Sequence, residues 1–391
     1  MRGQLVVVGG GVGGVAVASA ARERGWEGEV LVLDADEDAP YDRPPLSKDF
    51  LTEGTSTATM QEHWRESLDA SRITLRTGCR VTGLDLDGRL LSIDGAKDVP
   101  FDNLVLAPGA SPRRLPSLEG LPHVHYVNSL GTASKTRAAL KTASSVVVIG
   151  GGFIGCEVAS SAAKMGVKVT IVEAGPQLTG RVLPKEAASA IHRLHLRNGI
   201  DIRLGASVRS GTTEGSGLRL DLDDGSSLSA DVVIVGIGTI LNLGWLHGSG
   251  LSVDGGLSCE PDMSITSRPG VYAVGDVAAW WHLGYQRRVR VEHWTTTRLQ
   301  AAVVARSLNG EKVEMRSVPY VWSDQHGSHL QHLGDPDLTG VDVEEREARR
   351  GGELFVYHRQ GRVVGATGLD ARAEVMKLRR DLADGPQSGQ D

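Results

Sequence analysis

The chain has few cysteines, few aromatic residues and few extended apolar segments. Its three cysteines, Cys79, Cys156 and Cys259, are far apart, so the sequence contains no CxxC pair, zinc knuckle or disulfide framework. Redox chemistry in this chain would therefore need a cofactor. Aromatic residues make up 4% of the chain, which means that aliphatic side chains must form most of the core.

Membrane and nucleic-acid partners are not expected. The apolar segment from Leu5 to Ala21 imitates a signal peptide, but it contains five glycines and is followed by Arg22-Glu23-Arg24. No other segment approaches the roughly twenty apolar residues of a membrane span. A net charge of −6 argues against a globally basic nucleic-acid-binding protein. We therefore expect a cytoplasmic protein.

Metal-dependent and hydrolytic active sites also lack support. His326, His329 and His332 recur every third residue, and His192 and His195 share one face of a predicted helix. No cysteine stands at a useful spacing from them, so we expect surface or interdomain histidines and no metal site. A GxSxG nucleophile elbow between a strand and a helix is missing as well.

Glycine is the abundant residue, with 50 in a chain of 391, against a typical share of about 7%. This excess predicts tight turns and close approaches of the backbone to ligands. At roughly 150 residues per domain, the length predicts two or three domains.

The first predicted dinucleotide-binding segment has a strand, a glycine turn, a helix, a second strand and an acidic residue. In chain order these are Leu5 to Val8, Gly9 to Gly14, a helix to Arg24 capped by Gly25, Val30 to Leu33, and Asp34. Gly9 allows the tight turn, Gly11 lets the backbone approach a pyrophosphate, and Gly14 lets helix and strand pack closely. The helix N-terminus would bind the pyrophosphate, and Asp34 the ribose hydroxyls.

The same arrangement recurs later in the chain. It consists of Ser145 to Ile149, Gly150 to Gly155, a helix to Met165 closed by Gly166, a strand from Val167 to Val172, and Glu173. One such turn is weak evidence, but two in full context predict two bound dinucleotides. Glu173 would accept a hydrogen bond from a free 2′-OH and repel a 2′-phosphate, which favours NADH over NADPH. Arg181 could pair with that phosphate, so NADPH stays an alternative.

Four further segments carry a resemblance to a known family. They are Ala39 to Lys48 (APYDRPPLSK), Pro269 to Ala278 (PGVYAVGDVA), Arg290 to Trp294 (RVEHW) and Val318 to Gln325 (VPYVWSDQ). Together they resemble the FAD-dependent, NADH-using ferredoxin reductases, a group that includes the putidaredoxin, rubredoxin and biphenyl-dioxygenase ferredoxin reductases. The resemblance covers almost the whole chain. The related disulfide reductases carry a redox cysteine pair where this chain has prolines and Lys48.

The resemblance implies an α/β fold with two Rossmann-like dinucleotide-binding domains, as in glutathione reductase, and a C-terminal α+β interface domain. The FAD domain would be discontinuous, comprising residues 1–112 and 240–312, with the NAD(H) domain at 113–239 and the C-terminal domain at 313–391. Asp231 to Gly238 is predicted to be a buried strand that returns the chain to the FAD domain. A final helix is predicted near Ala371 to Leu382, before a polar, frayed tail from Asp384 to Asp391.

The resemblance also implies cofactor-binding residues. FAD would contact Gly9, Gly11, Gly13, Gly14, Asp34, Arg43, Lys48, Val81, Asp276 and Trp294, and NADH would contact Gly150, Gly152, Gly155, Glu157 and Glu173. Gly238 is a further predicted cofactor-binding residue. The alternative for Asp276 is an ordinary turn residue.

Lys48 and Glu157 are the candidate catalytic residues. In the family the matching side chains form an ion pair beside the flavin N5 and the nicotinamide. The carboxylate would favour oxidised nicotinamide, and Lys48 would stabilise the negative charge of a reduced flavin. The alternative is that Glu157 complements its helix N-terminus and that Lys48 is a solvated surface charge.

The chain departs from the family pattern at two positions. Pro108 replaces the threonine of Ala-Thr-Gly, and Asn128 replaces an arginine. Both changes alter polar contacts that the family makes near the flavin. Arg287, Arg288 and Arg290 form a basic run that would dock an acidic ferredoxin, although such a run is also typical of a solvated face.

The implied activity is transfer of a hydride from NADH to FAD N5, then of single electrons to a 2Fe–2S ferredoxin that serves a Rieske oxygenase or a cytochrome P450. Alternatives are a rubredoxin reductase, a non-enzymatic flavin and NADH redox sensor, and an NADH oxidase or peroxidase. An oxidase or peroxidase would need a redox cysteine where Tyr41 and Asp42 stand. The sequence leaves the oligomeric state open.

Overall fold

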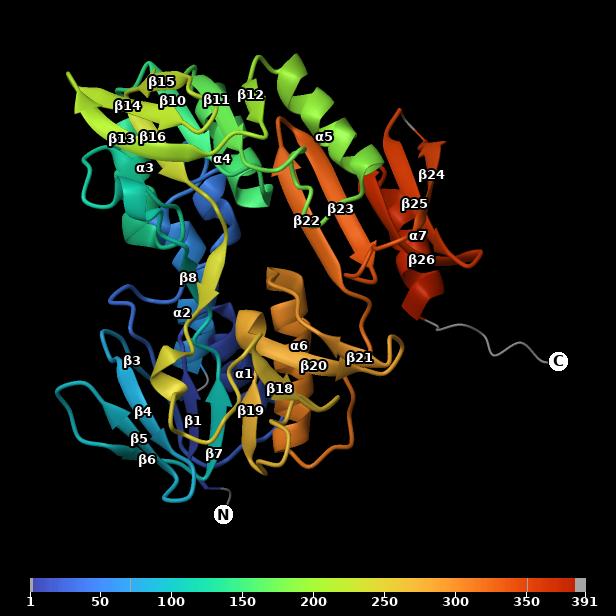
Figure 1. Cartoon of the computed structure of the whole chain (residues 1–391). Helices are drawn as coiled ribbons and strands as arrows, with labels where there is room; N and C mark the ends of the chain where they lie inside the picture. The colour runs from blue at the N-terminus through green and yellow to red at the C-terminus, as the bar shows by residue number, and fades with distance from the viewer. Residues whose placement is uncertain (1–2, 71, 350, 384–391) are drawn as a thin grey trace. The chain divides into compact units, whose positions relative to one another are not determined.

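The computed structural model describes residues 3–70, 72–349 and 351–383, and the predicted polar tail from Asp384 to Asp391 lies outside them. The chain forms two compact units (Figure 1). Unit 1 comprises Met1–Asp42, Thr57–Ser111 and Leu241–Pro319, and unit 2 comprises Arg43–Ser56, Pro112–Ile240 and Tyr320–Asp391. Two short strands, β8 (Ala110–Pro112) and β17 (Thr239–Leu241), carry the chain across the boundary. The segment APYDRPPLSK is divided, because unit 2 begins at Arg43.

Unit 1 is built on a five-stranded parallel sheet of order β19-β7-β1-β2-β3. The strands are β1 (Leu5–Val8), β2 (Val30–Leu33), β3 (Thr74–Arg76), β7 (Asn103–Leu106) and β19 (Val271–Ala273). Every residue of β1 and β2 is buried, as expected for inner strands covered on both faces. Helix α1 (Val12–Glu23) packs against α6 (Trp294–Leu308) and α2 (Thr57–Ala70).

Smaller elements complete unit 1. Three antiparallel strands form one small sheet: β4 (Val81–Asp85), β5 (Leu90–Ile93) and β6 (Val99–Pro100). A second small sheet contains β18 (Leu257–Cys259), β20 (Ala278–His282) and β21 (Arg287–Val289). The 3₁₀ turns η3 (Gly244–Leu246) and η4 (Gly275–Val277) precede β18 and β20 of this second sheet, respectively.

Unit 2 contains a second parallel sheet, of order β12-β11-β10-β16-β9. Its strands are β9 (Val124–His125), β10 (Ser145–Ile149), β11 (Lys168–Glu173), β12 (Asp201–Leu204) and β16 (Val232–Val235). Its helices and turns are η1 (Pro44–Ser47), η2 (Pro116–Leu118), α3 (Leu130–Leu140), α4 (Phe153–Lys164) and α5 (Lys185–Arg197).

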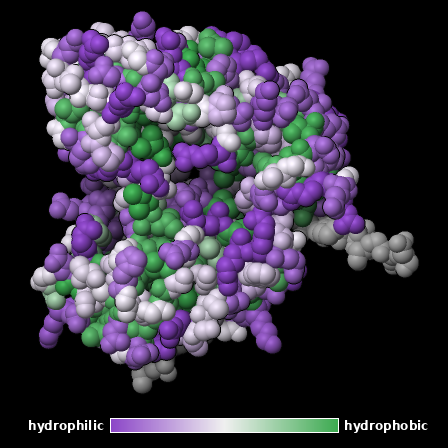
Figure 2. Space-filling model, viewed as in Figure 1, coloured by the Kyte–Doolittle hydropathy of each residue, from purple (hydrophilic) through white to green (hydrophobic). Residues whose placement is uncertain are grey.

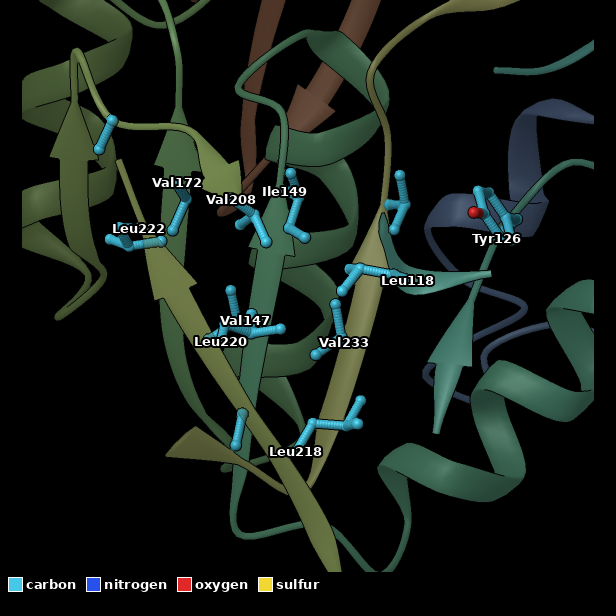
Figure 3. Close-up of a cluster of buried hydrophobic side chains, with 13 residues drawn as sticks. Leu118, Tyr126, Val147, Ile149, Val172, Val208, Leu218, Leu220, Leu222 and Val233 are labelled. Carbon is cyan, nitrogen blue, oxygen red and sulfur yellow. The ribbon is translucent and has the colours of Figure 1, made fainter. Parts of the chain in front are cut away.

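An antiparallel layer closes one part of the unit 2 core. It consists of β13 (Val208–Glu214), β14 (Gly217–Leu222) and β15 (Ser227–Ala230). Alternate residues of β14, Leu218, Leu220 and Leu222, are buried in the same cluster as Val147 and Val233 of the parallel sheet (Figure 3). This period of two is the pattern of a strand with one buried face.

A five-stranded antiparallel sheet of order β22-β23-β26-β25-β24 forms the last part of unit 2. The strands are β22 (Tyr320–Gln325), β23 (Ser328–Gly334), β24 (Asp342–Glu347), β25 (Glu353–Arg359) and β26 (Arg362–Leu369). The C-terminal helix α7 (Arg372–Ala383) packs against β23 and β26.

These elements confirm the predicted fold class, with two Rossmann-like sheets and a C-terminal α+β part. The strands at Leu5–Val8, Val30–Leu33 and Ser145–Ile149 have the predicted bounds. The strand predicted from Asp231 to Gly238 is shorter, because β16 ends at Val235 and Gly238 has a φ of 103°.

The surface carries isolated large apolar side chains. Among the described residues, Ile154, Val182, Leu196 and Ile240 are exposed. On the face drawn in Figure 2, small hydrophobic groups are interspersed with hydrophilic residues. None of the helices formed by the described residues combines the length and apolar character needed to cross a bilayer.

Candidate active site

The first glycine turn connects β1 to α1 in unit 1. Gly9 has a φ of 106°, and a Cβ there would lie 2.1 Å from the carbonyl oxygen of Ala107. A Cβ on Gly14 would lie 1.8 Å from the carbonyl oxygen of Gly9, so a larger residue would push α1 away. At Gly11, the N-cap of α1, nothing lies within 4 Å of the Cβ position and no side chain caps the helix. The turn therefore leaves an open approach to the N–H groups of α1.

The second glycine turn, between β10 and α4 in unit 2, repeats this geometry. Gly150 has a φ of 102°, and its Cβ position lies 2.4 Å from the carbonyl oxygen of Gly236. A Cβ on Gly155 would lie 2.0 Å from the carbonyl oxygen of Gly150. Gly152, the N-cap of α4, has open space at its Cβ position and no side-chain cap. Both turns thus fit a diphosphate, which needs close backbone approach and helix N–H donors.

Each turn has its predicted acid beside it. The Asp34 Oδ2 atom lies 2.5 Å from the Cβ position of Gly10. The Glu173 carboxylate accepts hydrogen bonds from the N–H groups of Gly151, at 2.6 Å, and Gly175, at 2.7 Å. The two hydrogen bonds hold the Glu173 carboxylate at the end of β11, and Asp34 directly follows the end of β2. Each acid thus stands where a ribose would lie next to a diphosphate bound at the turn.

Two further glycines that were predicted to bind a cofactor, Gly13 and Gly238, have different surroundings. Gly13 lies where α1 meets α6, and its Cβ would come within 2.9 Å of the Thr297 methyl group. Gly238 lies beyond the end of β16, and the Arg181 guanidinium lies 3.6 Å from its Cβ position. Strand β10 separates β16 from β11, the strand that ends at Glu173. Arg181 therefore lies beside Gly238, and the preference for NADH over NADPH stays a prediction.

Lys48 and Glu157 form a buried ion pair within unit 2. The Lys48 Nζ atom lies 2.7 Å from Glu157 Oε2, and the two side chains are only 15% and 6% exposed. Lys48 is therefore not a solvated surface charge. Its ammonium group also donates to the Pro44 carbonyl oxygen and lies 5.1 Å from the centroid of the Trp322 ring, within range of a cation–π interaction.

Two hydroxyl groups complete the environment of the Glu157 carboxylate. Ser47 Oγ donates to Oε2 at 2.5 Å, and Ser323 Oγ donates to Oε1 at 2.6 Å. Together with Lys48, these donors satisfy both oxygens of a carboxylate that would otherwise be costly to bury. The ion pair and both hydroxyls fix the orientation of the carboxylate.

Local structure explains how these groups meet. The two prolines at the start of η1 fix the φ angles of its first residues, which favours this short turn. The Ser161 hydroxyl on α4 donates to the Ser47 carbonyl oxygen at 2.8 Å and so holds η1 against α4. Strand β22 packs on the same helix (Figure 1).

Sequence reasoning assigned no role to Ser47, Ser323 or Trp322. Ser47 lies in the segment APYDRPPLSK, and Trp322 and Ser323 lie in VPYVWSDQ. Both segments carried the family resemblance. A serine or tryptophan has no spacing rule that reveals its contacts, because these contacts depend on how η1, α4 and β22 pack.

The remaining FAD candidates lie in unit 1, except Arg43. Trp294 begins α6, where its Nε1 donates to Asp42 Oδ1 at 3.1 Å and the Arg298 guanidinium lies 4.8 Å from its ring centroid. Asp276 lies in η4 and is partly buried. Val81 begins β4 and is only 7% exposed.

Both departures from the family pattern have contacts of their own. The Arg43 guanidinium donates to the carbonyl oxygen of Asn128 at 2.8 Å within unit 2. In unit 1 the carbonyl oxygen of Pro108 accepts a hydrogen bond from Asn242 Nδ2 at 2.9 Å, and that of Gly109 accepts one from the Asn242 N–H at 3.0 Å.

The basic run of unit 1 is partly neutralised. Arg288 lies 3.7 Å from Glu260 and donates to Thr266, while Arg290 forms an ion pair with Glu292 at 2.5 Å. The run therefore presents less net positive charge than its sequence suggests.

The expectation of surface or interdomain histidines is wrong for His332, which is 7% exposed and contacts Thr367 of the same predicted domain. His195 is fully buried, and its partner Gln325 belongs to the predicted C-terminal domain, so its position agrees with the interdomain alternative. Cys156 and Cys259 are also buried, and burial raises the pKa of both thiols, that of Cys259 to about 12. Both cysteines therefore stay protonated and unreactive.

Comparison with known proteins supports this description. The family model of the pyridine nucleotide-disulphide oxidoreductases matches residues 3–306, and the reductase C-terminal model matches residues 320–390. The anthranilate 1,2-dioxygenase system ferredoxin–NAD(+) reductase component of Burkholderia cepacia is 32% identical over 97% of this chain and 94% of its own length. Rhodocoxin reductase of Rhodococcus erythropolis is 34% identical over 97% of this chain and 89% of its own.

A solved structure of a related reductase also has the same fold. The crystal structure of the covalent putidaredoxin reductase–putidaredoxin complex matches with a TM-score of 0.92 and 30% identity, covering 97% of this chain and 93% of that one. The resemblance inferred from the sequence is confirmed. Because the family model spans most of the chain, the protein belongs to the pyridine nucleotide-disulphide oxidoreductase family and carries a reductase C-terminal domain.

Proposed function

We propose that the protein is an NADH-dependent ferredoxin reductase that binds FAD non-covalently. The observation that carries the proposal is the buried Lys48–Glu157 ion pair, in the same unit as the second glycine turn. In a disulfide reductase a cysteine pair relays the electrons. Here Cys156 adjoins Glu157 but is buried and unpaired, so an electron relay through sulfur has no basis among the described residues.

The two glycine turns divide the cofactors between them. Gly9, Gly11 and Gly14 would hold the FAD diphosphate, and Asp34 its adenosine ribose. Gly150, Gly152 and Gly155 would hold the NADH diphosphate. Glu173 would accept from the ribose hydroxyls of NADH and repel the 2′-phosphate of NADPH.

The candidate catalytic residues supply charge and orientation. FAD, when bound, accepts a hydride from NADH and gives up the two electrons one at a time to an iron–sulfur protein. The Glu157 carboxylate would stabilise the positive charge of oxidised nicotinamide, and the Lys48 ammonium group would stabilise negative charge on the flavin. Their burial strengthens both effects, because little water screens them.

The electron acceptor is a small acidic iron–sulfur protein in this proposal. Arg287, Arg288 and Arg290 remain the proposed docking residues, and their partial neutralisation predicts modest electrostatic steering. Unpaired cysteines are typical of reducing compartments, and with NADH as the donor the proposal assigns the enzyme to the cytoplasm.

The test is reduction of purified electron carriers. We expect the isolated protein to be yellow, to lose its flavin absorbance with NADH under anaerobic conditions, and to reduce ferredoxins in a panel that also contains rubredoxins. Reduction should be faster with NADH than with NADPH, and should slow moderately as salt is raised. A protein without flavin, or one that NADH does not reduce, would refute the proposal, and preference for rubredoxin would correct the acceptor.

A further inference from the structure

A chain of hydrogen-bonded side chains in unit 2 runs from Glu157 to two histidines. Ser323 Oγ lies 2.6 Å from Glu157 Oε1, and Gln325 Nε2 lies 3.0 Å from Ser323 Oγ. His195 Nε2 lies 2.9 Å from Gln325 Oε1, and His326 Nε2 lies 3.1 Å from His195 Nδ1. The four contacts connect the candidate catalytic carboxylate with side chains far from it in the sequence.

The inner part of this chain is sealed from solvent. Ser323 and His195 are 0% exposed, and Gln325 is 2% exposed. His326, at the outer end, is partly buried, and its backbone N–H donates to the Ser160 hydroxyl at 2.7 Å. Three elements, α4, α5 and β22, thus supply groups that contact one another in a low-dielectric interior, where each unmade hydrogen bond is costly.

The Glu157 carboxylate sets the direction of the first links. A carboxylate only accepts, so the single hydroxyl proton of Ser323 is donated to Glu157 Oε1. The Ser323 oxygen must then accept from Gln325, which it does from Nε2. The amide is thereby oriented with its carbonyl oxygen toward His195.

The same logic fixes the tautomers of both histidines. The Gln325 carbonyl oxygen only accepts, so His195 must carry a proton on Nε2. Burial lowers the pKa of His195 to about 4, which keeps the ring neutral at pH 7 and leaves Nδ1 without a proton. His195 Nδ1 therefore accepts from His326, whose proton must be on Nε2.

This network of hydrogen bonds orients the Glu157 carboxylate and does not conduct protons. Every donor points toward the carboxylate, and the amide of Gln325 cannot pass a proton without becoming an imidic acid. Loss of the Ser323 donor would leave Oε1 without its partner, while Ser47 and Lys48 hold only Oε2. Rotation of the carboxylate would then become easier.

We propose that Ser323, Gln325 and His195 are positioning residues that hold the Glu157 carboxylate in its reactive orientation, with His326 donating a hydrogen bond to His195 Nδ1. This assignment rests on the proposed function, because it gives Glu157 a role in the reaction. It extends the candidate active site from an ion pair to a directed network that reaches helix α5.

The first experiment observes the tautomers directly. The holoenzyme, labelled with ¹⁵N in its histidine rings, is studied by long-range ¹H–¹⁵N correlation at pH 7. We expect both His195 and His326 to be neutral and protonated on Nε2. A ring of His195 protonated on Nδ1 would overturn the proposal. This readout requires no turnover, so it stands even if the protein fails to reduce any ferredoxin.

Ser323→Ala tests whether the carboxylate imposes this order. Without the serine, Gln325 can flip, so both tautomers of His195 become allowed and the spectrum should show a mixture. Ser189→Ala is the matched control, because Ser189 lies on α5 with His195 but its hydroxyl donates to the Lys185 carbonyl oxygen. An unchanged His195 signal in Ser323→Ala would contradict the proposal.

A conservative replacement links the network to the reaction. His195→Gln keeps an N–H donor near the Nε2 position, whereas His195→Leu removes it. We expect anaerobic flavin reduction by NADH to slow by about tenfold in Ser323→Ala and His195→Leu, with little change in KM, and to recover largely in His195→Gln. Equal rates in the two His195 variants would assign the histidine a purely structural role.

Discussion

At the scale of single residues, the proposed chemistry would depend on how Glu157 is held. A buried carboxylate paired with one lysine still has unused acceptor capacity, and here two serine hydroxyls use it. Three short contacts, from Ser47, Lys48 and Ser323, restrict the side chain from both oxygens. A group fixed in advance can stabilise charge in a transition state without first reorganising.

Glu157→Gln should therefore slow the reaction more than it changes substrate binding. The amide has one acceptor oxygen instead of two and presents an NH₂ group to donors, so one of the three contacts must break. We expect anaerobic flavin reduction by NADH to fall by about tenfold to a hundredfold, measured by stopped-flow absorbance. Glu353→Gln, which removes a carboxylate from an exposed pair with Arg193, is the control and should react like the wild type. A normal rate in Glu157→Gln would exclude its role in the reaction.

At the scale of elements, the glycines of each turn meet two different requirements, close backbone packing and open space for a ligand. The sequence motif does not show which glycine meets which requirement. Gly150 and Gly155 are needed for the fold, because a Cβ at either position would meet backbone at 2.4 Å and 2.0 Å, respectively. Gly152 has no such neighbour and has an ordinary φ of −73°, so the fold tolerates a methyl group there. In the proposed function, the open space at Gly152 would instead admit the diphosphate of the ligand.

Gly152→Ala and Gly155→Ala should accordingly fail in different ways. Gly152→Ala should keep wild-type stability but raise the KM for NADH by about tenfold, because the methyl group occupies the approach of the diphosphate. Gly155→Ala should lower the free energy of unfolding by about 1–3 kcal/mol, because α4 must move away from β10. Urea unfolding and steady-state kinetics separate the two effects. Loss of stability in Gly152→Ala with an unchanged KM would refute this division.

At the scale of the whole molecule, unit 2 buries two histidines that an exposed chain would protonate in mild acid. Burial lowers the pKa of both His195 and His332 to about 4, from an ordinary value of 6.5. As the pH falls below 6.5, the unfolded chain gains protons at these residues that the folded chain does not bind. The free energy of unfolding therefore decreases progressively between pH 6.5 and pH 4.

The size of this effect is measurable by urea unfolding at pH 7.5 and pH 5. Each histidine should cost about 2 kcal/mol of stability at pH 5, so the two together would cost about 4 kcal/mol. His195→Gln and His332→Gln remove one titrating group each, and each should reduce the difference between the two pH values by about half of that sum. A wild type and variants with the same pH dependence would show that neither ring is held neutral.

Much of the fold follows from local sequence. The apolar runs from Leu5 to Val8 and from Ser145 to Ile149 are bounded by glycines that end a strand and start a helix, so their type and bounds could be predicted. The strand predicted to end at Gly238 was too long, because hydrophobicity alone does not mark where β16 leaves the sheet. Lys48 and Glu157 were paired only through the family resemblance, since 109 positions separate them and no periodicity connects them.

The sequence by itself determined that two glycine turns bracketed by strand, helix and acid occur in this chain, because their spacing is set by local backbone geometry. Tertiary structure alone decided that Ser47 and Ser323 join Lys48 at one carboxylate, and that His195 is buried rather than exposed. These contacts join α4, α5, β22 and η1, which come from distant parts of the chain. Packing brings such groups together, and packing has no signature in the order of neighbouring residues.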